Sequence, residues 1–224
     1  MTIEFKQRFI TSIFLILLLY FMLNYSVVLI SVLLLLFVFS WIEFNNLIEK
    51  IYYRFKKNSY RKFFFKFLIF FYLLFFIQIT IIEFMENLPD ISWNLLFVIL
   101  ICILSDLGGY VFGKTFKGKK LTKISPNKTY SGMIGSFLFP LIFSLFYSYS
   151  ISFVDFKTVM ILSLLISGIS QSGDLLISLL KRKAKVKDTS NILPGHGGLL
   201  DRIDGMLLAI PFGMIIFNFF IFTI

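Results

Sequence analysis

The sequence predicts an all-α integral membrane protein, a polytopic helical bundle of about seven transmembrane helices with a cytoplasmic N-terminus. Hydrophobic residues make up 58% of the 224 residues, and the mean hydropathy is +0.89, whereas soluble domains are about 45–50% apolar. The apolar residues form long runs, and the basic residues lie almost entirely in alternate connecting segments. Together these observations favour a chain that crosses a bilayer several times.

Seven apolar runs satisfy or approach the length of a membrane span. A hydrocarbon core about 30 Å thick requires roughly 20 apolar residues in a helix. The expected spans are residues 9–23, 26–44, 63–82, 93–113, 131–149, 158–180 and 205–222. The first run follows Lys6 and Arg8 like a signal peptide, but no alanine lies near its end to form a cleavage site, so we expect a retained span.

The distribution of Lys and Arg predicts the orientation. All of the 22 basic residues except Lys157 fall in the N-terminal segment or in and next to loops on the same predicted side, with Lys66 just inside the third expected span. Because basic loops stay in the cytoplasm, we expect the N-terminus inside and the C-terminus outside. The loop 45–62 would then face lipid headgroups as an anchor. The net charge of +10 is accounted for by these loops, so we expect membrane lipid and no nucleic acid as a partner.

Polar residues suited to chemistry concentrate in the C-terminal part of the chain. The first 90 residues are almost featureless apolar runs, while nearly all glycines and prolines and the intramembrane aspartates follow them. We therefore expect residues 1–92 to form a scaffold and 93–224 a catalytic region with cytoplasmic loops 114–130 and 181–204. The single Cys102 excludes an internal disulfide.

Asp106 lies inside the fourth predicted span. An ionisable side chain there is costly unless it faces a polar cavity, so Asp106 is a candidate for the active cavity. A structural hydrogen-bonding role is the alternative. Gly109 and Gly113 follow with the G-x-x-x-G spacing, which allows another helix to approach closely.

Asp174 holds a similar place in the sixth predicted span. Ser170, Asp174, Ser178 and Lys181 recur at helical spacing, so one helix face leads from a buried carboxylate to the basic cytoplasmic end. Magnesium is usually held by one or two carboxylates together with substrate phosphates. This stripe suits a magnesium-bound phosphate that enters from the cytosol.

The loop 181–204 carries the densest chemistry. Gly197 and Gly198 permit close approach of the backbone to phosphate, and the start of the following helix offers unpaired N–H donors to an anion. Asp201 and Asp204 lie three residues apart, on one face of the first turn. Two carboxylates among many cations suit a site shared by a divalent metal and a polyphosphate. A helix cap beside a solvated basic loop is the alternative.

Two further positions have both a chemical and a structural interpretation. His196 is the only histidine, which excludes a His-rich metal site; its glycine neighbours suit a phosphate contact, and a structural role is equally open. Ser125 begins a proline-broken turn that leads to Lys128 at the start of the fifth span. Lys128 suits a phosphate as a compact point charge, or the interface as a snorkelling anchor.

These motifs resemble a known family. The stretch from Ser178 to Asp204 resembles the signature of the phosphatidate cytidylyltransferases, S-x-x-K-R-x-x-x-x-K-D followed by P-x-H-G-G-x-x-D-R-x-D. The matching residues are Ser178, Lys181, Arg182, Lys187, Asp188, Pro194, His196, Gly197, Gly198, Asp201, Arg202 and Asp204. Residues 105–114 and 125–132 are similar to the family's upstream Asp-containing helix and its S-P-K-K-T turn, with Asn127 in place of the first lysine.

The resemblance implies transfer of a cytidylyl group from CTP to phosphatidate, which gives CDP-diacylglycerol and pyrophosphate in phospholipid biosynthesis. It implies Mg²⁺, for which Mn²⁺ substitutes, held by Asp174 and Asp201, a second cation such as K⁺, and a homodimer. The residues expected in catalysis are Asp174, Asp201, Lys128, Lys187 and Asp188. Those expected to bind substrate are Ser125, Lys181, Arg182, His196, Gly197, Gly198, Arg202, Asp204 and Asp106.

Three other functions match parts of the same pattern. A cytidylyltransferase or CTP-dependent kinase acting on another membrane lipid, such as a polyprenol, shares the same motifs. The D-x-x-D-G start of a CDP-alcohol phosphatidyltransferase occurs at Asp201, but no Ala-Arg pair and no further Asp follow it. A small polytopic transporter should carry charges on both faces, whereas here the charges gather on the predicted cytoplasmic side.

Overall fold

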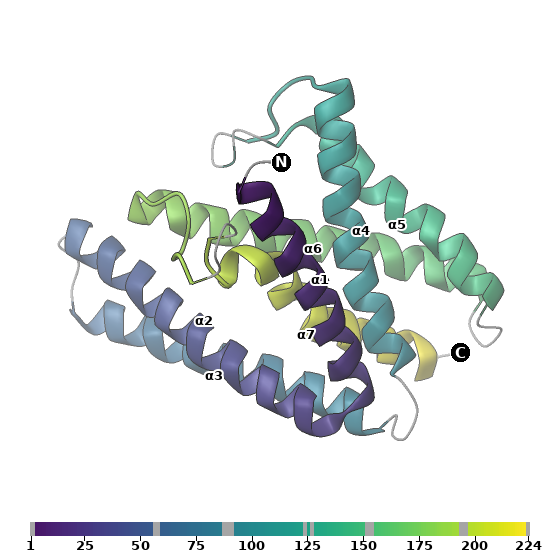
Figure 1. Cartoon of the computed structure of the whole chain (residues 1–224), viewed down its shortest axis with the longest axis horizontal. Helices are drawn as coiled ribbons and strands as arrows, with labels where there is room; N and C mark the ends of the chain where they lie inside the picture. The colour runs from purple at the N-terminus through teal and green to yellow at the C-terminus, as the bar shows by residue number, and fades with distance from the viewer. Residues whose placement is uncertain are drawn as a thin grey trace. The chain divides into compact units, whose positions relative to one another are not determined.

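The computed structural model describes residues 3–55, 59–86, 92–122, 125, 128–150, 155–192 and 197–222, with side chains left out at 3–12, 54–55, 150 and 221–222. Within these residues the regular structure is seven helices (Figure 1), and Lys120 and Thr129 form an isolated antiparallel β-bridge. The helices are α1 (Ile3–Asn24), α2 (Ser26–Phe55), α3 (Ser59–Glu86), α4 (Trp93–Phe116), α5 (Tyr130–Ser150), α6 (Phe156–Ala184) and α7 (Leu200–Phe222). The predicted all-α class is confirmed.

Six helices of the described chain, α2 to α7, are long and apolar enough to cross a membrane. In α1, the described side chains form only a shorter apolar stretch, Ile13–Asn24. Large apolar side chains such as Val27, Phe63 and Phe146 are exposed. Such exposure is expected where the surrounding medium is lipid rather than water. The chain is thus a multi-pass membrane protein.

The structure consists of two compact units. The first contains Met1–Ser92 and Leu180–Ile203, and the second contains Trp93–Leu179 and Asp204–Ile224. Residues 180–203, which the sequence assigned to the catalytic region, therefore fold with the N-terminal helices. The functional division into scaffold and catalytic region stays a prediction.

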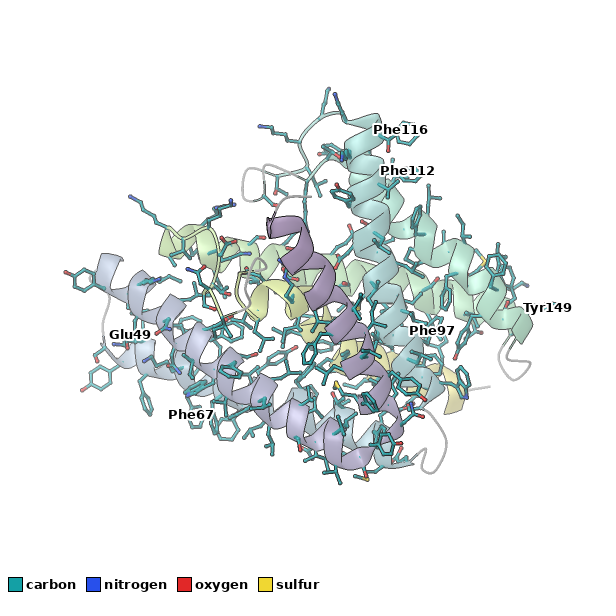
Figure 2. All side chains as sticks on the ribbon, viewed as in Figure 1. Glu49, Phe67, Phe97, Phe112, Phe116 and Tyr149 are labelled. Atoms are coloured by element: carbon teal, nitrogen blue, oxygen red, sulfur yellow. The ribbon has the colours of Figure 1, made fainter. Side chains whose placement is uncertain are left out.

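In the first unit, α2 and α3 form an antiparallel pair with an aromatic seam. Phe37 and Trp41 of α2 contact Phe70 of α3 edge-to-face, with ring centroids 5.4 and 5.2 Å apart. Lys62 and Lys66 of α3 pair with Glu49 of α2, at 2.5 and 2.7 Å; Glu49 is labelled in Figure 2. The expected loop 45–62 is therefore mostly helix, because good helix formers and these ion pairs extend both helices beyond their apolar runs.

In the second unit, α4 and α5 touch through their backbones. A Cβ on Gly108 would lie 2.1 Å from the carbonyl oxygen of Gly135, and one on Gly109 would lie 2.6 Å from Ser136 Oγ. The close approach predicted from Gly109 and Gly113 is confirmed, although the tightest contact is at Gly108. Nearer the start of α4, Phe97, labelled in Figure 2, contacts Tyr147 with a centroid separation of 4.5 Å and the two rings tilted by 47°.

Replacement of Gly108 by alanine is expected to destabilise the protein by about 1–3 kcal/mol or more, because the added methyl group collides with the backbone of α5. Gly168→Ala is the matched control, since the nearest atom to its Cβ would be 3.9 Å away. Thermal unfolding of both variants in detergent measures the difference. Equal melting temperatures would show that α4 and α5 accommodate the added methyl group without loss of stability.

Candidate active site

A pocket of about 280 Å³ lies in the second unit, where α4, α5 and α6 meet the segment between α4 and α5. Its charged and polar lining includes Asp106, Ser125, Lys128, Gln171 and Asp174. Four of these five, all except Gln171, are residues that the sequence marked as site candidates. The structure thus brings together side chains that lie up to 68 residues apart (Asp106 to Asp174) in the sequence.

Lys128 and Asp174 form an ion pair in this pocket. Their side chains are 26% and 25% exposed, so both remain accessible from the pocket. Ser178 Oγ, one turn farther along α6, donates to Asp174 Oδ1 at 3.2 Å. The Asp174 carboxylate therefore pairs with an ammonium group and accepts a hydrogen bond from a hydroxyl. Charge-assisted contacts of this kind are among the stronger hydrogen bonds in proteins.

Backbone hydrogen bonds between residues 119–121 and 128–130 position Lys128. Leu121 N–H donates to the Lys128 carbonyl at 2.8 Å, and Tyr130 N–H donates to the Lys119 carbonyl at 3.1 Å. Thr129 then caps α5, because its Oγ1 accepts from Gly132 N–H at 3.1 Å. The local sequence thus fixes the backbone on both sides of Lys128.

Asp204 lies beside Asp174 because α6 and α7 approach closely. A Cβ on Gly173 would lie 2.6 Å from the Asp204 carbonyl oxygen, and one on Gly205 would lie 2.5 Å from Ser170 Oγ. The Asp204 carboxyl interacts directly with that of Asp174 and also with the charge of Asp106. The second unit therefore brings the carboxyl group of Asp204 next to that of Asp174, which also pairs with Lys128.

In the first unit, Asp201 is buried and surrounded by donors. Its side chain is 8% exposed, and its Oδ1 contacts Lys181 Nζ at 2.5 Å. Its Oδ2 accepts from Thr189 N–H at 2.8 Å, from Gly198 N–H at 3.1 Å and lies 3.0 Å from Thr189 Oγ1. A carboxylate has about four lone-pair directions, so a cation at Asp201 would have to replace one of these donors.

The chain between α6 and α7, residues 185–199, is called here the α6–α7 loop. It begins with a Schellman closure at Lys185, whose φ is 56°, with Val186 N–H donating to the Lys181 carbonyl at 3.0 Å. The side chains of Arg182, Lys187, Asp188 and Arg202 are exposed. Gly197 has a φ of 81°. His196, Pro194 and Asn127 lie outside the described residues.

Sequence reasoning missed Glu43. Its side chain is fully buried in α2, yet it accepts hydrogen bonds from the α6–α7 loop at Thr189 and Ser190. The rule that identified Asp106, an ionisable side chain in an apolar run, applies equally to Glu43. It was overlooked because Glu43 lies at the end of its apolar run, where a charge is expected to face the headgroups.

The described residues contain no group of three or more His, Cys, Asp and Glu side chains arranged as a metal centre. Magnesium requires less, since one or two carboxylates plus substrate oxygens hold it in most phosphoryl-transfer sites. The neighbouring carboxylates of Asp174 and Asp204 are hard oxygen donors that suit this cation.

Comparisons with a family model and with individual proteins both match this chain to cytidylyltransferases. Residues 2–220 match the model of a cytidylyltransferase family. The phosphatidate cytidylyltransferase of Staphylococcus aureus (strain COL) is 42% identical over 141 residues, 61% of this chain and 53% of that protein. That of Rickettsia felis is 37% identical over 145 residues, 60% of this chain and 63% of that protein. The chain thus covers less than two thirds of the length of each of these relatives.

Proposed function

Because the chain belongs to the cytidylyltransferase family, we propose that it transfers a cytidylyl group from CTP to phosphatidate, giving CDP-diacylglycerol and pyrophosphate. The observation that carries the proposal is the pocket in which Lys128 pairs with Asp174 of α6, a helix whose last turn is basic. The relatives' names supply the lipid substrate.

The proposed reaction joins two anions. A phosphate oxygen of phosphatidate forms a bond to the α-phosphorus of CTP, the bond from that phosphorus to the oxygen bridging to the β-phosphate breaks, and pyrophosphate leaves. A phosphate monoester with a second pKa of about 6 is largely ionised at neutral pH, so we assign no general base. The protein's task is to position and neutralise charge.

The chain's own residues suit that task. Lys128, Lys187 and Arg202 are proposed to contact CTP phosphates, and Asp106 to line the cavity. Ser125, Lys181 and the other predicted binding residues would complete the surroundings of the substrates. From the family motif, Asp174 and Asp201 are the proposed Mg²⁺ ligands, with Mn²⁺ as a substitute and K⁺ as a second cation; at Asp201 the ion would replace one of the four donors described above. When bound, the divalent ion would neutralise phosphate charge.

We further propose that the protein lies in the cell membrane and that its active site faces the cytoplasm. The basic loops supply the orientation argument, since positively charged segments remain inside. CTP would then enter from the cytosol while the acyl chains of the lipid stay among the helices. A homodimer remains an expectation of the family resemblance.

A lipid panel tests the proposed function. Purified protein in nanodiscs is incubated with labelled CTP, Mg²⁺ and phosphatidate, a polyprenol phosphate or a polyprenol. We expect labelled CDP-diacylglycerol from phosphatidate alone. The assignment of phosphatidate as acceptor would be rejected if labelled product formed only with a polyprenyl substrate. It would also be rejected if turnover of CTP did not depend on the lipid added.

Removal of divalent ions is expected to abolish the reaction, because repulsion between the two phosphate-bearing substrates would be left uncompensated. Excess chelator should lower the initial rate to background, and added Mg²⁺ or Mn²⁺ should restore it. Full activity in chelator would exclude a required metal ion. Circular dichroism in chelator serves as the control that the helices remain folded.

A further inference from the structure

Glu43 makes a dense set of hydrogen bonds within the first unit. Its Oε2 accepts from Thr189 Oγ1 at 2.7 Å and from Leu200 N–H at 2.9 Å. Its Oε1 accepts from Ser190 Oγ at 2.5 Å and from Leu199 N–H at 2.9 Å. A side chain of α2 thus binds two hydroxyls and two backbone amides from a segment about 150 residues away in the sequence.

Among the described residues, the position just before α7 carries no capping side chain. Leu199 precedes the helix, and its carbonyl accepts from Arg202 N–H at 2.9 Å, which places Leu199 at the N-cap position. A leucine side chain cannot accept the free N–H groups of the first turn, whereas Ser, Thr, Asp or Asn could. Glu43 fills this role from another helix, and its negative charge suits the positive end of the helix dipole.

Thr189 connects Glu43 to Asp201. Its Oγ1 lies 2.7 Å from Glu43 Oε2 and 3.0 Å from Asp201 Oδ2, and its N–H donates to Asp201 Oδ2 at 2.8 Å. One hydroxyl has a single hydrogen to donate. The carboxylates of Glu43 and Asp201 therefore compete for the hydroxyl hydrogen of Thr189. A shift of the Glu43 carboxylate would change the hydrogen bonding, and hence the position, of the Asp201 carboxylate.

The packing around this connection leaves no spare room. A Cβ on Gly198 would lie 1.8 Å from Thr189 Oγ1 and 2.9 Å from Glu43 Oε1. Gly198 also donates its N–H to Asp201 Oδ2 at 3.1 Å. The glycine preceding α7 is thus required for Glu43, Thr189 and Asp201 to meet.

We infer that Glu43 is a positioning residue, which holds the α6–α7 loop and the start of α7 and, through Thr189, sets the position of the Asp201 carboxylate. The inference rests on the proposed function for its kinetic consequence, because Asp201 is a proposed metal ligand. A charge in an apolar helix is costly unless specific partners repay it, and every partner named here belongs to the segment that precedes or begins α7.

The test compares Glu43→Gln and Glu43→Ala with Glu83→Gln in the full chain in nanodiscs. Glu83 is the matched control, since it is a buried carboxylate of α3 in the same unit, 3% exposed, with Ser92 Oγ 3.4 Å away. Glutamine keeps the size of Glu43 but turns one acceptor into a donor, so this variant remains informative if the alanine variant does not fold.

The first measurement is hydrogen exchange at Leu199 and Leu200 without CTP, lipid substrate or metal. We expect exchange at these amides to be roughly tenfold faster or more in Glu43→Gln, because two amides lose a charged acceptor or share a weaker one. Glu83→Gln should exchange there like the wild type. Equal exchange at Leu199 and Leu200 in the wild type, Glu43→Gln and Glu83→Gln would overturn the inference.

The second measurement is the Mg²⁺ concentration for half-maximal activity and the KM for CTP. For Glu43→Gln we expect both to rise at least about tenfold at matched folded fraction, since second-sphere changes typically cost about 10–100-fold. A merely structural role would lower kcat per total protein and leave both constants unchanged, which would overturn the inference. If the wild type made no CDP-diacylglycerol, the proposed function would fail, and the exchange result alone would decide the role of Glu43.

Discussion

Replacement of Asp174 by asparagine is expected to lower the initial rate of CDP-diacylglycerol formation by about 100- to 1000-fold. Asparagine keeps the shape of the side chain but removes the charge that pairs with Lys128. It also removes a proposed ligand of the divalent ion. The measurement is the rate at saturating CTP, Mg²⁺ and phosphatidate for protein in nanodiscs.

Ser172→Ala provides the matched control for Asp174→Asn. Ser172 lies on the same helix, is exposed, and donates to the Gly168 carbonyl of its own helix at 2.8 Å. Its replacement should leave the rate near that of the wild type. Membrane insertion and melting temperature should be similar in both variants, and near-normal turnover by Asp174→Asn would refute the assigned role of Asp174.

Replacement of Asp201 by asparagine is expected to lower both activity and stability. Lys181 is only 13% exposed and would lose its partner carboxylate, and leaving one charge of a buried pair uncompensated costs about 3–5 kcal/mol. The melting temperature should therefore fall, and the rate should fall by about 100-fold or more because a proposed metal ligand is lost.

The double variant Lys181→Gln with Asp201→Asn separates these two effects. It removes both charges of the pair, so most of the lost stability should return. Activity should stay low, because the carboxylate and a proposed substrate-binding lysine are both absent. Recovery of the rate together with the melting temperature would show that Asp201 serves the fold alone.

The helices were predictable because the bilayer dictates their length and composition. Every expected span lies within one helix of the structure, and six of these helices, α2 to α7, are long and apolar enough in the described chain to cross a membrane. Helix ends were less predictable: α2 and α3 continue beyond their apolar runs, since the Glu49 pairs with Lys62 and Lys66 stabilise helix outside the region that hydropathy reports. Orientation, in contrast, rests on the basic loops alone.

The site was predictable in its residue types and only partly in its partners. An aspartate within an apolar run is recognisable as a site candidate from the sequence alone, as Asp106 and Asp174 were. The family resemblance added Lys128 as a candidate. The pairing of Lys128 with Asp174 depends on how α5 and α6 pack, which no local spacing reveals. The same holds for Glu43 and Thr189, whose side chains meet across 146 residues of sequence.

The backbone contact between Gly108 and Gly135 has a consequence for altering what the pocket accepts. With no side chain between α4 and α5 at this point, neither helix can slide or rotate past the other without a collision. The side of the pocket that carries Asp106 and Thr129 is therefore a fixed wall. Enlarging the pocket by engineering should begin on α6, at Gln171, where a shorter side chain creates space without disturbing that wall.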